Sequence, residues 1–339
     1  MKNRTKGVCA LVIGVLAAAL AGCGGGGGNG STGSTGTSGG SSQATGYVLF
    51  ATDLNSGSIA AFTTAAPVAG QALAAHIVKS REGGKGIVYD ALHDDLYAIR
   101  IANFLPAVTI DVFAHASRMT TDAAPTRTIQ VTGLADLQNS MALDTTRDEL
   151  WIGGVGSQVA NKPGRLVVLA HASTLSGSVA PTRDVVDLPT FSTFAHDRTR
   201  DVLYLAGGGG IVHGVYVFAN ASTLVSGTPP TRTIDSVDGT GTALMSVDEQ
   251  RDILYVPDVF NGLGIVHGAS TVTPTTASVP FPIAAPCQTA AVDSTHDRLY
   301  IGAYTDAYVF DNASTLKSGS SLPGVTVHAD GASIYSFAF

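Results

Sequence analysis

The sequence predicts an all-β protein, a six-bladed β-propeller with four antiparallel strands in each blade. Three observations predict this fold. A motif ending in tyrosine or tryptophan recurs about every fifty residues. Each period divides into four short segments rich in β-branched and aromatic residues, separated by Gly, Asn, Asp and Pro. The repetitive region has no sustained helical period. Four strands in a repeat of this length are typical of a propeller blade.

The first repeated motif has the pattern Asp-x-x-x-Asp-x-Leu-Tyr/Trp. Its starting aspartates lie 54, 53, 51 and 45 residues apart. They are Asp90, Asp144, Asp197, Asp248 and Asp293. The motif predicts a tight hairpin between the first and second strands of a blade, in which the aspartates accept backbone N–H groups as in Asx turns. Because the motif is nearly the same in every copy, we expect it to be structural.

Two further motifs follow in most periods. An Asn/His-Ala-Ser-Thr-Leu loop comes after the third strand, as at 220–224 and 312–316, with His171 at the Asn position of another copy. Pro-Thr-Arg precedes the fourth strand at 125–127, 181–183 and 230–232. The fifth period lacks Pro-Thr-Arg, which predicts a shortened outer strand there.

Counting the strands predicts how the propeller closes. First and second strands of a blade each occur six times, and the chain enters at a second strand, 47–51, and leaves at a first strand, 333–339. The last segment should therefore pair with the first one and complete its sheet. This pairing would join the chain ends and leave no unmatched edge in the ring.

These motifs carry a resemblance to known propellers. A Leu-Tyr pair after an Asp-containing hairpin, about every fifty residues from Tyr47 to Phe339, resembles the NHL/YVTN superfamily of β-propellers. The resemblance implies the propeller fold and does not specify an activity.

The N-terminus has the features of a bacterial export signal. Lys2, Arg4 and Lys6 precede a short apolar run that ends in Leu20-Ala21-Gly22-Cys23. This ending resembles the lipobox of bacterial lipoproteins, which implies cleavage before Cys23 and attachment of diacylglycerol to its sulfur. An ordinary secretory leader with an accidental cysteine is the alternative.

The predicted organisation has three parts: a signal peptide at 1–22, an acylated Cys23 with a tether at 24–46, and a propeller domain at 47–339. The tether is almost wholly Gly, Ser and Thr, so it cannot bury apolar surface and should be flexible. The resemblance to lipoproteins implies an exported protein held at the membrane by its lipid. Gly24, in place of Asp after the cysteine, implies sorting to the outer membrane.

Composition limits the partners and the cross-links. The formal net charge is −7, and a mildly acidic chain without clustered Lys or Arg is unsuited to nucleic acid. After Cys9 leaves with the leader and Cys23 is acylated, Cys287 is the one remaining cysteine, so no intrachain disulfide is expected. We expect Cys287 to be a small buried apolar residue rather than a nucleophile. A monomer is expected.

The loops on the other side of the blades, opposite the hairpins, vary from period to period. In propellers this side surrounds the axial funnel, so the sequence predicts the ligand there. The candidate ligand-face residues are Lys85, Asp136, Asn139, His213, Asp238, Gln288, His328 and Asp330. No catalytic residue and no metal ligand is assigned among them.

Two functions follow as hypotheses. The first is a propeller that binds a protein, a glycan or a small envelope ligand without catalysis or cofactor. The alternative is a metal-dependent envelope enzyme, of lactonase or streptogramin-lyase type, which would use Asp238, Asp330, His213 or His328 with a divalent cation. The alternative rests on the superfamily resemblance alone.

Overall fold

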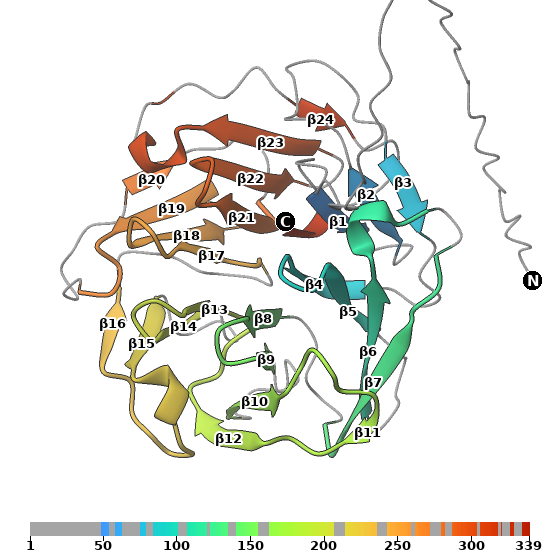
Figure 1. The fold of residues 1–339 in the computed structure, drawn as a ribbon. Coiled ribbons are helices and arrows are strands. Elements are labelled where there is room, and N and C mark those ends of the chain that lie inside the picture. The colour runs from blue at the N-terminus through green and yellow to red at the C-terminus, as the bar shows by residue number, and fades with distance from the viewer. Residues whose placement is uncertain are drawn as a thin grey trace, which may run out of the picture. The chain divides into compact units, whose positions relative to one another are not determined.

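The structure is a computed structural model (Figure 1). The residues it describes are 49–53, 58–62, 75–78, 84–100, 107–120, 123–134, 140–154, 163–206, 214–235, 243–258, 262–271, 279–281, 287–303, 306–317, 320, 326–328 and 334–339. The predicted signal peptide, Cys23 and the tether lie outside these residues. No helix among the described residues has the length and apolar character needed to cross a membrane.

The described strands form six sheets, which are numbered here in chain order. Sheet 1 contains, in spatial order, β25 (Ile334–Ala338), β1 (Leu49–Asp53), β2 (Ile59–Phe62) and β3 (Ala75–Val78). Sheet 2 contains β4 (Gly84–Asp90), β5 (Asp95–Arg100), β6 (Ala107–Ala114), β7 (Arg127–Thr132) and β11 (Gly177–Val179). Sheet 3 contains β8 (Ser140–Asp144), β9 (Glu149–Gly154), β10 (Gly164–Ala170) and β12 (Arg183–Leu188).

The other three sheets repeat the same order. Sheet 4 contains β13 (Thr193–Asp197), β14 (Val202–Ala206), β15 (Val215–Ala219) and β16 (Arg232–Ile234). Sheet 5 contains β17 (Ser246–Asp248), β18 (Ile253–Asp258), β19 (Gly262–His267) and β20 (Val279–Phe281). Sheet 6 contains β21 (Thr289–Asp293), β22 (Arg298–Ala303), β23 (Asp306–Asp311) and β24 (Thr326–His328). The all-β prediction is confirmed.

Single turns of 3₁₀ helix follow the third strand in three sheets. They are η1 (Ala116–Arg118), η2 (Ala221–Thr223) and η3 (Ala313–Thr315). Each is preceded by a residue in the left-handed conformation: His115, Asn220 and Asn312 all have φ 57°. Asn and His tolerate this region better than most side chains. The left-handed backbone conformation therefore explains why Asn or His recurs at this position.

Strand β11 is an element that the motifs did not predict. It pairs in parallel with β7, the outer strand of the preceding sheet, from Gly177 opposite Ile129 to Val179 opposite Val131. The segment after the third strand of sheet 3 thus adds a fifth strand to sheet 2. It covers the outer edge of β7, which would otherwise present unpaired N–H and C=O groups.

The aromatic residue of the repeated motif forms the centre of each sheet's packing. Tyr97, Trp151, Tyr204, Tyr255 and Tyr300 are fully buried, and Phe50 takes the matching place on β1. Each lies on the second strand, with both faces of its sheet covered by apolar side chains of neighbouring sheets. Burying a large aromatic side chain contributes about 2–3 kcal/mol. The Leu-Tyr/Trp repeat is thus the signature of the core.

The first strands of successive sheets lie next to one another. β25 contacts β4, β4 contacts β8, β8 contacts β13, β13 contacts β17, β17 contacts β21, and β21 contacts β25. β25 also pairs antiparallel with β1, with Phe50 opposite Ala338 and Ala51 opposite Phe337. The predicted pairing of the last strand with the first is confirmed.

The Pro-Thr-Arg motif fastens one sheet to the next. The guanidinium of Arg127, on β7, donates to the backbone oxygens of Ala172 and Leu175 in the following sheet at 2.9 and 2.7 Å. Arg183, on β12, donates in the same way to the oxygens of Ala221 and Ser222. Arg232, on β16, donates to the oxygen of Ser270. The repeat could be seen in the sequence, and the structure shows that its arginine links neighbouring sheets.

We expect Arg183→Met to lower the free energy of unfolding by about 1–3 kcal/mol, because charged hydrogen bonds to two carbonyls are lost. The variant also loses the contact of the guanidinium with the Trp151 ring, 4.7 Å from its centroid. Arg165→Met is the matched control: Arg165, on β10, pairs with Asp184 on β12, where the side chains are 33% and 41% exposed, and among the described residues it donates a single bond to a carbonyl of the preceding sheet, that of Gly133 at 2.9 Å. We expect the control to change stability by less than about 1 kcal/mol. Urea unfolding followed by circular dichroism measures both, and equal losses would contradict the prediction.

Candidate functional site

The repeated hairpins place five aspartates between the first and second strands of sheets 2–6. In the hairpin of sheet 3, Asp144 Oδ1 accepts the N–H groups of Thr146 and Arg147 at 2.9 and 3.0 Å. The equivalent aspartates Asp90, Asp197, Asp248 and Asp293 also accept N–H groups in their own hairpins. The predicted Asx turns are confirmed.

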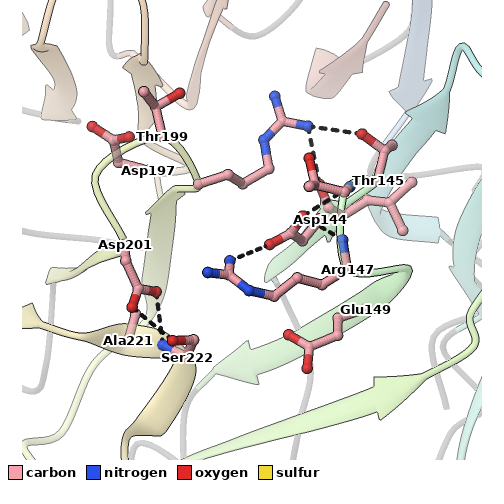
Figure 2. A network of polar contacts seen from close by, with 12 residues as sticks. Asp144, Thr145, Arg147, Glu149, Asp197, Thr199, Asp201, Ala221 and Ser222 are labelled. Carbon is pink, nitrogen blue, oxygen red and sulfur yellow. Dashed lines mark hydrogen bonds and ion pairs between the residues drawn. The ribbon is translucent and has the colours of Figure 1, made fainter.

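The second aspartate of each motif joins its hairpin to the loop that follows the third strand of the same sheet. Asp201, with φ 55°, accepts the backbone N–H of Ser222 at 2.8 Å and its hydroxyl at 2.6 Å (Figure 2). The same two bonds link Asp94, Asp148, Asp252 and Asp297 to the serines Ser117, Ser173, Ser270 and Ser314. These carboxylates are therefore engaged in holding the fold.

A basic residue occupies the fourth position of every hairpin, a regularity missing from the sequence prediction. Arg147 donates to Asp144 Oδ2 at 2.8 Å (Figure 2), and Arg200 and Arg251 pair with Asp197 and Asp248 at 3.0 Å. His93 and His296 take this place in sheets 2 and 6. The pattern Asp-x-x-Arg/His-Asp could have been read from the sequence, because the residue is basic in all five copies.

Arg200 and Arg251 also reach the next sheet. The Arg200 guanidinium donates to the backbone oxygen of Glu249 at 2.6 Å, and that of Arg251 donates to the oxygen of Ser294 at 2.8 Å. Neighbouring hairpins are thereby held at a fixed spacing. The hairpins of sheets 4, 5 and 6 are thus joined to one another, and the five hairpins together are called the rim.

A cavity of about 410 Å³ lies within this rim. It is bounded by the first strands of all six sheets. Two positions before the first aspartate of each hairpin, and at the matching place on β25, the side chain is small. These residues are Val88, Ala142, Ala195, Ser246, Ala291 and Ala338. Small side chains on six converging strands leave space between them.

The first residue after the starting aspartate differs from hairpin to hairpin. The five residues are Ala91, Thr145, Arg198, Glu249 and Ser294, and all of them line this cavity or the adjoining one of about 670 Å³. We call the two cavities and these five residues the hairpin mouth. The aspartates and the basic residue of the hairpins are repeated for structural reasons, whereas this position and the next one vary and are available to contact a ligand.

Arg198 and Glu249 form an ion pair at the hairpin mouth. Arg198 Nε donates to Glu249 Oε1 at 2.6 Å, and the Thr199 hydroxyl donates to the other carboxylate oxygen at 3.2 Å. The Arg198 side chain is 37% exposed and that of Glu249 18%, so the pair is held in place yet reachable. The Arg198 Nη1 contacts with Thr145 Oγ1 and the Leu143 oxygen are long, at 3.4 and 3.5 Å.

His196 lies at the end of β13 and borders the cavity. Its ring stacks on Trp151 with the centroids 4.2 Å apart, and only 5% of the residue is exposed. Neither ring nitrogen has a hydrogen-bond partner among the described residues. Burial lowers the pKa of His196 to about 4, although the nearby carboxylate of Asp144 acts in the opposite direction. His196 is therefore neutral at pH 7.

The predicted ligand-face residues lie mostly outside the described part of the chain. This holds for Asp136, Asn139, His213, Asp238 and Asp330. Lys85 lies within β4. Gln288 precedes β21 and is half-buried, and its backbone bridges Leu244 and Gly302. His328 ends β24, opposite Asp306. β21 and β24 are the two edges of sheet 6, so the backbones of Gln288 and His328 lie at opposite edges of that sheet.

Two further observations concern metals and cysteine chemistry. Among the described residues, no group of three or more His, Cys, Asp and Glu side chains is placed to hold a metal ion. Cys287 is fully buried in the apolar cluster with Ile265 and Ile301. The prediction that Cys287 is a buried residue is confirmed.

Comparisons with known proteins support the fold. No protein-family model and no curated protein matches the sequence. Among solved structures, one described as the crystal structure of a nidogen/laminin complex has a TM-score of 0.57 and 14% sequence identity, covering 86% of this chain and 97% of that chain. A functionally unknown protein from Desulfotomaculum acetoxidans DSM 771 has a TM-score of 0.51 and 10% identity, covering 81% and 78%. At these identities the likeness concerns the fold alone, and together with the sheet order it shows an all-β chain with a fold of the β-propeller type.

Proposed function

We propose that this chain is an exported, lipid-anchored, six-bladed β-propeller that binds a ligand of the cell envelope at the hairpin mouth, without catalysis. The observation that carries the binding site is the hairpin mouth itself. Its cavity is bounded by six strands, and its rim is formed by the variable positions of otherwise repeated hairpins. Repetition maintains the scaffold, whereas variation between the repeated positions of each hairpin is what selective binding needs.

Several features support six blades in a closed ring of NHL/YVTN type. There are six sheets, their first strands contact one another in succession from β25 to β21 and back to β25, and β25 pairs with β1. A closed ring removes the exposed sheet edges that favour aggregation.

The chemistry of the hairpins supports binding rather than catalysis. The ten hairpin aspartates serve as acceptors for backbone N–H groups, serine hydroxyls, arginines and histidines within the fold. A fold of this type also occurs in a nidogen/laminin complex, so the architecture is compatible with holding another molecule. The ligand-face residues predicted on the opposite side remain a prediction.

The anchor is tested by Cys23→Ser. Because thioether attachment of diacylglycerol needs the cysteine sulfur, we expect the variant to lose metabolic labelling by a fatty-acid probe completely. It should also leave the membrane fraction, since acyl chains supply about 0.8 kcal/mol per buried CH₂ group. Cys287→Ser is the matched control and should keep the label. Labelled Cys23→Ser protein would exclude the anchor, and fractionation of inner from outer membranes tests the sorting.

Binding at the hairpin mouth is tested by blocking it. Thr199 is exposed at the mouth and Ser178 is exposed on β11, so both accept a bulky side chain without disturbing the core. Full-length wild type, Thr199→Trp and Ser178→Trp are titrated by calorimetry with neutral disaccharides, short peptides and an acyl-homoserine lactone. We expect one class to bind unchanged and to be blocked by Thr199→Trp alone. Binding that Thr199→Trp leaves intact, or hydrolysis of the lactone, would overturn the proposal.

A further inference from the structure

We infer that the hairpin mouth takes a neutral sugar unit, of one or two residues, from a free saccharide or the end of an envelope glycan. This inference rests on the proposed function and names the ligand class for that site. It follows from three properties of the mouth: a pair of opposite charges, a set of hydroxyl groups, and aromatic rings beside them.

The charges at the hairpin mouth cancel. Each charged carboxylate that lines the mouth is paired: Glu249 with Arg198 at 2.6 Å, and Asp293 with His296 at 2.6 Å. A charged ligand therefore gains attraction from one partner of a pair and meets repulsion from the other. A neutral ligand has no such conflict. The choice between charged and uncharged ligands therefore favours the uncharged class.

The same pair offers both kinds of hydrogen-bonding group at one place. Arg198 Nη2 has no acceptor among the described residues, and the Glu249 carboxylate has lone pairs beyond the bonds from Arg198 and Thr199. A sugar hydroxyl donates one hydrogen bond and accepts others, so neighbouring hydroxyls can accept from the guanidinium and donate to the carboxylate. Hydrogen bonds that involve a charged group are about twice as strong as neutral ones.

Further polar groups line the mouth at the height of the hairpins. They are Thr145, Thr199, Gln250, Ser294 and Thr295. Hydroxyl and amide groups that both donate and accept suit a ligand with many hydroxyls.

Aromatic and apolar groups complete the match. Tyr89 borders both cavities, and its hydroxyl is bonded to Asp94 at 2.9 Å, which fixes the ring. Phe339 borders both cavities as well. Leu92 projects from its hairpin with 72% of its surface exposed. The C–H faces of a pyranose ring pack on such surfaces while its hydroxyls point outward to the polar groups.

The size of the site sets the length of the ligand. A cavity of about 410 Å³ opening into one of about 670 Å³ is in the range of small-molecule pockets. We take these volumes to admit one or two sugar rings. Longer glycans would leave the mouth and enter solvent.

The test compares two double variants that remove the same chemical pair at different places. Arg198→Met with Glu249→Met removes the pair at the hairpin mouth. Arg165→Met with Asp184→Met, called the outer variant, removes an equivalent pair between β10 and the outer strand β12, where the two contacts are 2.7 and 2.6 Å. Replacing both partners by apolar groups avoids leaving one charge unpaired, so both proteins should fold. Thermal unfolding by circular dichroism checks this.

Full-length proteins, in a detergent without a sugar headgroup, are titrated calorimetrically with the neutral disaccharides maltose, cellobiose, lactose and N,N′-diacetylchitobiose, and with the charged sugars glucosamine and glucuronic acid. We expect wild type to bind at least one neutral disaccharide more tightly than the charged sugars. Its affinity should fall at least tenfold in the mouth variant and stay within twofold in the outer variant. An intact glycan that ends in that disaccharide is titrated as well. If it binds with the same affinity, the natural ligand is the end of a glycan chain; if it does not bind, the natural ligand is a free saccharide.

The failures are distinguishable. Absence of binding to every neutral saccharide, or a preference for a charged sugar, overturns the sugar inference. If a peptide binds instead and Thr199→Trp blocks it, the proposed function stands and the sugar class is wrong. Equal loss of saccharide binding in the two double variants, or none in either, overturns the mouth as the sugar site.

Discussion

Asp144→Ala is expected to lower the free energy of unfolding by about 3 kcal/mol, measured by urea unfolding at pH 7. Asp144 has no exposed surface, and its carboxylate accepts two backbone N–H groups and the Arg147 guanidinium. Burial raises its pKa, but the bonds from Arg147 outweigh burial, so the pKa lies below its usual value and the group is ionised. Alanine leaves both N–H groups and the arginine without this acceptor.

Two substitutions separate the causes of this loss. Asp144→Asn keeps an oxygen for the hairpin N–H groups and removes only the charge, so we expect about half of the effect. Asp184→Ala removes a carboxylate that is 41% exposed in its pair with Arg165, and should cost less than about 1 kcal/mol. Trp151, the only tryptophan in the sequence, is fully buried in the same sheet and reports the transition by fluorescence. An Asp144→Ala protein as stable as Asp184→Ala would show that the Asx turns are not needed.

The wild-type protein is expected to lose part of its free energy of unfolding between about pH 6.5 and pH 4 because of His196, and His196→Phe is expected not to show this part of the loss. The pKa of His196 is about 4 in the folded protein and near 6.5 in the unfolded chain. Below pH 6.5 the unfolded chain binds a proton that the folded protein does not, so stability falls as the pH drops from about 6.5 to 4. The total is about 3 kcal/mol. Above pH 6.5 this contribution does not change.

The comparison isolates one histidine among many titrating groups. Phenylalanine keeps the stack on Trp151 and has no ring nitrogen to leave without a partner, so the variant should be at least as stable as wild type at pH 7. The free energy of unfolding is measured for both proteins at pH 7, 5.5 and 4, and the wild-type value is subtracted from that of the variant at each pH. A difference that does not grow toward pH 4 would contradict a depressed pKa, and NMR titration of the ring gives an independent value.

The sequence allowed much of the fold to be predicted because the repeat marks both the core and the turns. Tyr97, Tyr204 and Tyr300 recur since each fills the same buried place, and the hairpin aspartates recur since each satisfies the same N–H groups. Strand β11 was missed because Gly177–Val179 has no β pattern of its own. Its pairing partner β7 lies far away in the sequence, so tertiary contact decides the conformation.

The candidate site was harder to predict from the sequence. The loops opposite the hairpins vary most between repeats, so they attracted the prediction of a ligand-binding face. The structure draws attention to single positions within constant hairpins, where Arg198 and Glu249 differ from Ala91. Their pairing joins two hairpins 51 residues apart in the chain, and no local pattern encodes that contact. The stacking of His196 on Trp151 likewise arises from packing between sheets, and no local sequence pattern near either residue predicts it.

The arginines of β7, β12 and β16 distribute the contacts between an outer strand and the next sheet unevenly along the chain. They fasten sheet 2 to sheet 3, sheet 3 to sheet 4, and sheet 4 to sheet 5. The outer strands β20, β24 and β3 contain no arginine in their sequences. The arginine contacts span 38 to 48 residues of sequence, so they close much shorter loops than the pairing of β25 with β1, which joins the remotest parts of the chain. Because a shorter loop has a smaller closure entropy, we expect the pairing of β25 with β1 to open before these contacts do when the protein is heated.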